Sequence, residues 1–175
     1  MFRYIVNSGI VAIGVIVVSI VSALLSGYAL SKIRFKGSSL VLVLALSTMM
    51  IPFEMTMIPQ YLLFHTLNLI DTYWVFYLPA LNYAFGTFLA KQFMDQLPTA
   101  LREAAIIDGA KERTVFWKIY FPLCIPIVAT MIILQFLAVW NDLLWPLLAL
   151  NSPDKYTIQL GLAMFTYNQG LNKLP

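Results

Sequence analysis

Long apolar stretches alternate with short polar ones along this chain. Between Tyr4 and Ser31 there is no Asp, Glu, Lys or Arg, and three further mostly apolar stretches follow. A helix rises about 1.5 Å per residue, so roughly 20 apolar residues cross a hydrocarbon layer of about 30 Å. The pattern therefore predicts four membrane-spanning helices, over residues 8–30, 39–63, 72–94 and 121–140.

Prolines interrupt the later stretches. The interrupting residues are Pro52 and Pro59 in the second, Pro79 in the third, and Pro122 and Pro126 in the fourth. A proline removes a backbone donor and bends a helix, and the freed carbonyls need partners within a membrane. We expect these breaks to face protein or water. Segment 141–175 stays apolar but is interrupted by Pro146 and Pro153, which predicts an outer loop that partly re-enters the membrane.

Small residues recur at every fourth position in the first span, at Ser19, Ala23, Gly27 and Ser31. Such a stripe allows another helix to approach closely. We interpret it as a packing surface in preference to a substrate site.

Composition supports a membrane protein. Hydrophobic residues make up 61% of the 175 residues and charged residues 11%, whereas soluble domains average roughly 25% charged. The fold class predicted is therefore an all-α integral membrane bundle. The net charge of +3 gives no support for nucleic-acid binding, and the single Cys124 and single His65 form no disulfide or metal cluster. We expect no metal, no cofactor and no catalytic residue. The first apolar run is longer than the 7–15 residues of a signal peptide core, which favours a span over a cleaved signal.

Basic residues set the orientation. Of the eleven lysines and arginines, three lie in the first connection (Lys32, Arg34, Lys36) and five in the third (Lys91, Arg102, Lys111, Arg113, Lys118). Because cytoplasmic loops carry an excess of Lys and Arg, these two connections are predicted to be cytoplasmic. The N-terminus, the loop around His65 and the tail are then outside.

The third connection is a polar insert whose loop covers residues 95–120. "PTALREAAII" predicts a short helix, which Pro98 starts by its fixed φ and Thr99 by side-chain capping. Gly109 then breaks the helix, because glycine tolerates positive φ. "AKERTVFWKIY" resumes as a second helix that runs up to the membrane.

Two interpretations of the insert are open, an amphipathic helix on lipid and a docking element for a protein. Acidic residues at Glu103, Asp108 and Glu112 suit an anionic inner leaflet poorly. Leu101, Ala104 and Ala105 recur at helical spacing on one face, and the two adjacent alanines allow close backbone approach. These features favour a groove on another protein.

The insert carries a motif with defined spacing. Glu103-Ala104-Ala105 is followed after three residues by Gly109, then after nine by Ile119, and then by Phe121 and Pro122. This order resembles the EAA loop of type-1 ABC importer permeases, with Phe121 where that family has leucine. The phrases "FRYIVNS", "YALSKIRFKG", "MMIPFEMTMIPQY", "LIDTYW", "WNDLLWPL" and "YTIQLGLAMF" are similar to the carbohydrate-uptake subfamily, of the maltose/glycerol-phosphate type, in its smaller second membrane subunit. That family has a further helix beyond each end of the matched region, so the resemblance implies that terminal helices are missing here.

The resemblance implies a permease subunit of an importer in the bacterial inner membrane. Its partners would be an ABC ATPase dimer, a second permease subunit and an extracytoplasmic solute-binding protein; the chain itself has no glycine-rich phosphate loop. Glu103 would pair with a donor in an ATPase cleft, while Ala104 and Ala105 would allow a close fit. Gly109 would set the angle between the two helices, and Asp108 would either cap the second helix or serve only the turn. Ile119 and Pro122 complete the coupling motif.

Several polar residues are candidates for the substrate pathway. They are Glu54, Asn141, Asp142 and Tyr156, with Tyr167 as a further residue that could stack on a sugar or fill a protein pocket. Glu54 is a candidate because charges in a membrane are costly, and its alternative is snorkelling to the outer surface. Asn141 and Asp142 are alternatively an interfacial anchor.

Two competing functions are open. One is the same machine with another solute, such as a peptide or phosphate. The other is a secondary transporter or channel subunit that uses no ATP, which would leave the polar insert unexplained and would predict inverted repeats or paired intramembrane ions.

Overall fold

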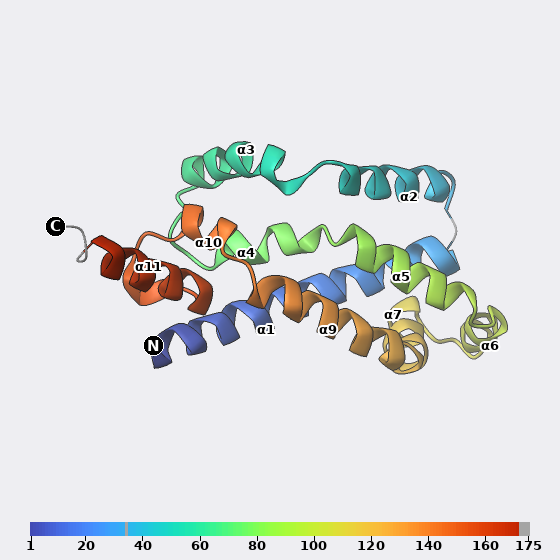
Figure 1. Ribbon diagram of the computed structural model, residues 1–175. Coiled ribbons are helices and arrows are strands. Elements are labelled where there is room, and N and C mark those ends of the chain that lie inside the picture. The colour runs from blue at the N-terminus through green and yellow to red at the C-terminus, as the bar shows by residue number, and fades with distance from the viewer. Residues whose placement is uncertain (34, 172–175) are drawn as a thin grey trace. The chain divides into compact units, whose positions relative to one another are not determined.

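The computed structural model describes residues 1–33 and 35–171, and these residues form helices without any strand. The α-helices are α1 (Phe2–Tyr28), α2 (Ser38–Ser47), α3 (Phe53–Thr66), α4 (Trp74–Tyr77), α5 (Ala84–Asp95), α6 (Ala100–Ile107), α7 (Glu112–Val115), α8 (Phe121–Leu123), α9 (Ile125–Trp140), α10 (Leu144–Ala149) and α11 (Ile158–Leu171) (Figure 1). Short π or 3-10 turns are η1 (Ala29–Ile33), η2 (Thr48–Met50), η3 (Pro79–Leu81), η4 (Phe116–Tyr120) and η5 (Pro153–Lys155). The predicted all-α class is confirmed.

The chain divides into two compact units. Unit 1 comprises Met1–Ile16, Pro52–Ala80 and Leu134–Pro175, and unit 2 comprises Val17–Ile51 and Leu81–Ile133. The polar insert lies entirely in unit 2, whereas the residues proposed for the substrate pathway lie in unit 1.

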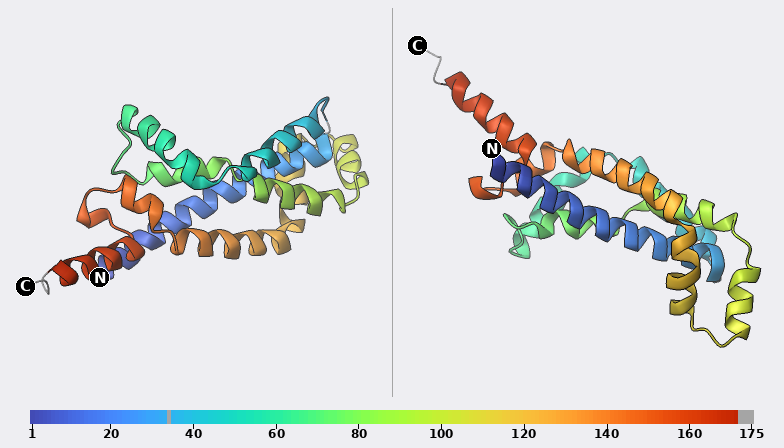
Figure 2. Two further views of the ribbon diagram at one scale, coloured as in Figure 1. Left: turned by 45° about the horizontal axis from the view of Figure 1, so that its top comes forward. Right: turned by 90° about the horizontal axis from the view of Figure 1, so that it is seen from below.

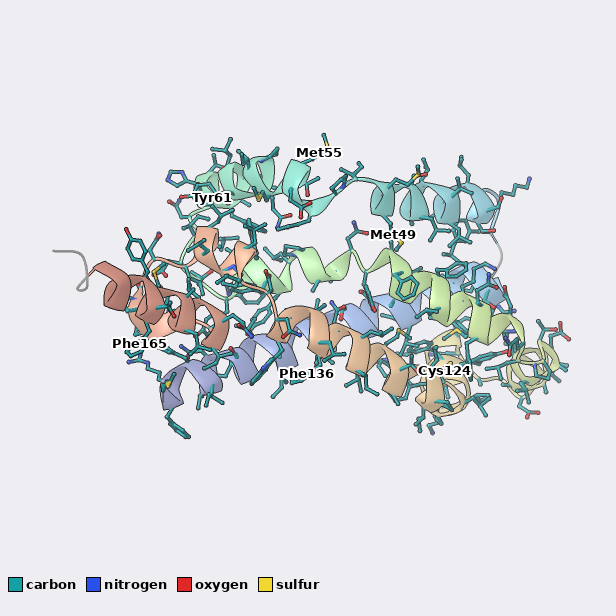
Figure 3. The ribbon with its side chains drawn as sticks, in the orientation of Figure 1. Met49, Met55, Tyr61, Cys124, Phe136 and Phe165 are labelled. Carbon is teal, nitrogen blue, oxygen red and sulfur yellow. The ribbon has the colours of Figure 1, made fainter. Side chains whose placement is uncertain are left out.

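Within the described residues, one helical run is long and apolar enough to cross a membrane by itself, Phe2–Ile33 with 32 residues. Two further runs reach that length only if a broken pair counts as one span, with breaks between Met50 and Phe53 and between Leu123 and Ile125. The second break turns the axis by 75° next to Cys124, whose buried side chain is labelled in Figure 3.

The predicted proline breaks account for most of these interruptions. Pro52 stands immediately before α3, and Pro79 ends the short α4 so that the expected third span is divided into α4, η3 and α5. Pro59 is accommodated inside α3. Residues 141–171 differ from the predicted loop, because they contain α10 and the 14-residue α11.

Unit 2 is built on the predicted small-residue stripe. Ser19, Ala23 and Ser31 are 0–1% exposed, and Gly27 is also buried. A Cβ atom added to Gly27 would lie 2.7 Å from the Cβ of Ala90 and 2.9 Å from the backbone N of Lys91. Gly27 therefore allows α1 to pack closely against α5 at Ala90 and Lys91, as small residues at a helix interface do.

Unit 1 is held by an aromatic core and a carboxylate clasp. The Trp145 indole is buried, donates to the carbonyl of Val75 at 3.0 Å, and packs edge-on to the Phe53 ring. Asp71, in left-handed backbone conformation (φ 62°), accepts hydrogen bonds from the Ser152 N–H and hydroxyl and from the Lys155 ammonium. Burial alone would raise the pKa of Asp71, but these donors together hold it well below its usual range.

Candidate functional site: the polar insert

Helix α6 and the run α7–η4–α8 form two neighbouring arms joined by a turn at Asp108–Gly109, as the right-hand view in Figure 2 shows. The predicted order of helix, glycine turn and helix is confirmed. The start of α6 differs from expectation. Thr99 has helical angles (φ −67°, ψ −25°) and makes no side-chain cap, because a capping residue needs extended backbone. Its carbonyl instead accepts from the N–H groups of Arg102 and Glu103.

The turn after α6 is a Schellman motif. The Ala110 N–H donates to the Ala105 carbonyl at 2.9 Å, and the Gly109 N–H donates to the Ile106 carbonyl at 3.0 Å. Gly109 has φ 81°, and no atom lies within 4 Å of a Cβ built there, so the need for glycine is conformational. Asp108 is the last residue of this turn before Gly109, and Lys111 precedes α7 without a side-chain cap. Asp108 therefore does not stand at the N-cap of the second helix and is instead the C-cap residue of α6.

The two alanines of the motif differ in burial. Ala105 is 9% exposed and faces the interior of unit 2, whereas Ala104 and Glu103 are exposed. The predicted shared face of Leu101, Ala104 and Ala105 is thus divided. The outer face of α6, termed here the docking face, consists of Leu101 (39% exposed), Ala104 and Ile107 (84% exposed). Ile107 was missed, although its place three residues after Ala104 would have indicated it.

The rest of the motif lies on the second arm. Ile119 is half-buried in η4, and Pro122 is exposed in the first turn of α8. Because α7, η4 and α8 form the continuous helical run Glu112–Leu123, Pro122 stands near the end of that run, where it fixes φ and offers no N–H.

An ion pair crosses the turn between the two arms. The Arg102 guanidinium on α6 pairs with Oε1 of Glu112 on α7, and Oε2 of Glu112 accepts from the Tyr28 hydroxyl of α1 at 2.6 Å. The hydrogen bond from Arg102 lowers the pKa of Glu112, partial burial opposes this, and the Tyr28 hydroxyl lowers it further. The same pairing raises the pKa of Arg102. Glu112 is therefore turned toward its own chain and is not presented with Glu103.

A second group of contacts fixes the base of the insert. Ser31 donates to Oδ1 of Asp95 at 2.6 Å, and Lys91 pairs with Oδ2 of Asp95 at 2.5 Å. Partial burial would raise the pKa of Asp95, but these two donors lower it. Lys32 is 6% exposed, donates to the Leu97 carbonyl at 2.6 Å and lies 5.5 Å from the centre of the Tyr120 ring. These contacts were not predicted from the sequence; the i,i+4 spacing of Lys91 and Asp95 was the available signal.

The residues predicted for the substrate pathway make mostly local contacts. Asn141 donates to Leu137 in its own helix at 2.8 Å, and Oδ1 of Asp142 accepts from the Trp145 N–H at 3.3 Å. Burial raises the pKa of Asp142 despite hydrogen bonds from the backbone nearby. Tyr156 is half-buried with its ring 6.4 Å from that of Tyr4.

Glu54 and Tyr167 are exposed on α3 and α11. Unit 1 also has an open cavity of about 470 Å³, and none of its lining residues was predicted for the substrate pathway. Those residues are Thr72, Tyr73, Trp74, Tyr77 and Lys155.

Comparison with known proteins identifies the family. Residues 15–173 match the family described as binding-protein-dependent transport system inner membrane component. The chain belongs to this family.

Relatives of this permease family member carry names from carbohydrate and related transport. It is 40% identical over 166 residues to the arabinooligosaccharides transport system permease protein AraQ of Halalkalibacterium halodurans, covering 95% of this chain and 60% of that protein. It is 34% identical to the sn-glycerol-3-phosphate transport system permease protein UgpE of Yersinia enterocolitica, covering 94% of this chain and 58% of that protein.

Among solved structures, a bacterial ABC transporter involved in the import of the acidic polysaccharide alginate matches with a TM-score of 0.83 at 26% identity, over 93% of this chain and 57% of that one. The predicted resemblance to carbohydrate-uptake permeases is confirmed. The chain spans about 60% of the length of the curated relatives it matches.

Proposed function

We propose that this chain is the membrane permease subunit of an ATP-driven importer for carbohydrates in the bacterial inner membrane. Its partners are a separate ATPase dimer, a second permease subunit and an extracytoplasmic solute-binding protein. The family match and the relatives named for arabinooligosaccharides and alginate support this proposal. A relative named for sn-glycerol 3-phosphate makes a small phosphate ester the second candidate cargo.

The observation that carries the proposal is the docking face of α6. Leu101, Ala104 and Ile107 present apolar surface on a short helix, with Glu103 beside them. An amphipathic helix that lays its apolar face into a groove is a recurrent mode of protein recognition. Burying one isoleucine side chain contributes about 1.5–3 kcal/mol, so Ile107 alone would be a substantial anchor in an ATPase groove.

The docked helix would act mechanically. Closure of the ATPase dimer would displace α6 as a rigid element, and rigid-body movement of this kind is a common way to switch access between the two sides of a membrane. ATP hydrolysis would take place in the partner, and this chain would transmit the movement and form part of the pathway.

Co-purification from the native membrane tests the proposal. We expect a subunit with a glycine-rich phosphate loop to accompany the unsubstituted chain, and Ile107→Asp and Ala104→Trp to remove it while the chain still inserts in the membrane. Arg113→Gln, which changes an exposed residue of α7, should keep the ATPase bound. Equal recovery of the ATPase with all three variants would overturn the docking assignment.

Uptake by proteoliposomes of the complete complex separates the cargoes. Accumulation of an arabino-oligosaccharide, with none of sn-glycerol 3-phosphate, supports the carbohydrate proposal. The reverse result would contradict it.

A further inference from the structure

We propose that Tyr28 and Glu112 are positioning residues which, with Arg102, hold α6 at a fixed orientation to the C-terminal end of α1. A displacement of α6 would then move α1 instead of bending the turn at Gly109. This inference rests on the proposed function of α6 as the coupling helix. Tyr28, Arg102 and Glu112 together form what we call the α1–α6 joint.

The connections at the two ends of α6 do not hold its orientation by themselves. It is entered through Pro98–Thr99 without a side-chain cap, and it leaves through Gly109 at φ 81°, where glycine has wide backbone freedom. A helix of two turns attached in this way would change its orientation when a force acts on it. The Arg102–Glu112 pair closes the exit turn, because its two residues lie ten positions apart on either side of Gly109.

Tyr28 connects this closed turn to the long helix. Its hydroxyl donates to Glu112 at 2.6 Å, and its side chain is 4% exposed. The ring is packed edge-on to Phe116 at 5.3 Å and to Tyr120 at 5.1 Å. The packing of the ring therefore fixes the position of the hydroxyl, and the hydrogen bond to this hydroxyl fixes the position of the Glu112 carboxylate.

The entrance of α6 is tied to the same aromatic group. The Tyr120 side chain is fully buried and its hydroxyl donates to the Pro98 carbonyl at 3.3 Å. Tyr120 packs against Tyr28, so the contacts at both ends of α6 lead to the same part of α1. The orientation of α6 is thus set by side chains from three helical segments.

The energetics favour a role in geometry over a role in stability. The side chains of Arg102 and Glu112 are 25% and 40% exposed, and ion pairs with this exposure contribute little to folding. Directional hydrogen bonds from a fixed hydroxyl and a guanidinium nevertheless define one geometry. Removing them should loosen α6 while the chain still folds and inserts.

Two measurements on the same variants test the joint. In the complete complex in proteoliposomes, we expect Tyr28→Phe and Glu112→Gln to lower the solute transported per ATP hydrolysed by about fivefold, a typical size for a coupling effect, with the ATPase still bound. Separately, a spin label at Ala100→Cys, the exposed first residue of α6, in a Cys124→Ser background, should become more mobile in both variants. Tyr61→Phe and Arg113→Gln are matched controls and should change neither measurement. Arg102→Lys, which keeps the charge but loses the planar fork, should retain more coupling than Arg102→Met.

The outcomes are distinct. Unchanged transport per ATP with the ATPase bound would overturn the positioning role, whether or not the label becomes more mobile. Unchanged mobility would overturn the structural basis of the joint. If the unsubstituted complex binds no ATPase, the proposed function fails, and the inference that rests on it fails too.

Discussion

Arg102 and Glu112 form an ion pair across the turn that ends α6, and the Tyr28 hydroxyl donates to the other oxygen of the same carboxylate. The pairing predicts how the insert responds to pH. The pKa of Glu112 is lowered from 4.5 in the folded chain, so its contribution to stability is fully present above pH 4.5 and is lost as the pH falls through the lower folded value. The half-exposed side chains limit this contribution to at most about 1 kcal/mol.

Thermal unfolding in detergent between pH 7 and pH 3 measures the effect. The difference in Tm between the unsubstituted chain and Glu112→Gln should be present at pH 7 and should shrink below pH 4.5. A difference that does not change with pH would show that the carboxylate charge is not what stabilises the turn.

Gly109 should be required for its backbone conformation alone. A left-handed residue with a Cβ costs roughly 1–2 kcal/mol, and no neighbour crowds the position, so Gly109→Ala should weaken coupling and Gly109→Asn should weaken it less. Gly37 provides a matched control, because it has φ 88° and an equally open surrounding, yet lies between η1 and α2. Transport per ATP should fall in Gly109→Ala and stay normal in Gly37→Ala.

Gly27 should be required for space. A Cβ there would lie 2.7 Å from the Cβ of Ala90 and 2.9 Å from the Lys91 backbone, and overpacking of this kind costs about 1–3 kcal/mol. We expect Gly27→Ala to lower the Tm in detergent. Gly9→Ala on the same helix meets no atom within 4 Å and should leave the Tm unchanged or raise it. A similar Tm for both variants would contradict the close contact between α1 and α5.

The Asp71 clasp should hold the segment from Asn151 to Lys155. Asp71→Asn removes charge-assisted hydrogen bonds, each contributing about 1.5–3 kcal/mol, and should increase amide hydrogen exchange in that segment. Because the pKa of Asp71 is lowered from 3.8, the protection should persist down to that pH and be lost only at more acidic values. Asp154→Asn, which breaks only the exposed pair with Arg3, should leave the exchange rates almost unchanged.

The sequence predicted the elements better than their contacts. Hydrophobic runs and prolines indicated the long first helix and the broken later ones, because span length and proline chemistry are local properties. Spacing alone also identified the glycine turn. The different burial of Ala104 and Ala105 could not be predicted in this way, because which side of α6 faces the interior of unit 2 depends on contacts with residues distant in sequence, such as the bond from the Tyr120 hydroxyl to the Pro98 carbonyl. For the same reason the partners of Glu112 were missed, since Tyr28 lies 84 residues away.

The docking face of α6 is the central claim, and site-specific photo-crosslinking tests it most directly. A photoreactive residue at Ile107, which is 84% exposed, should form an adduct with a P-loop ATPase subunit in the intact membrane. The same residue at Ala105, which faces the interior of unit 2, should not. Adducts of Ile107 with lipid alone, or equal ATPase adducts from both positions, would contradict the account.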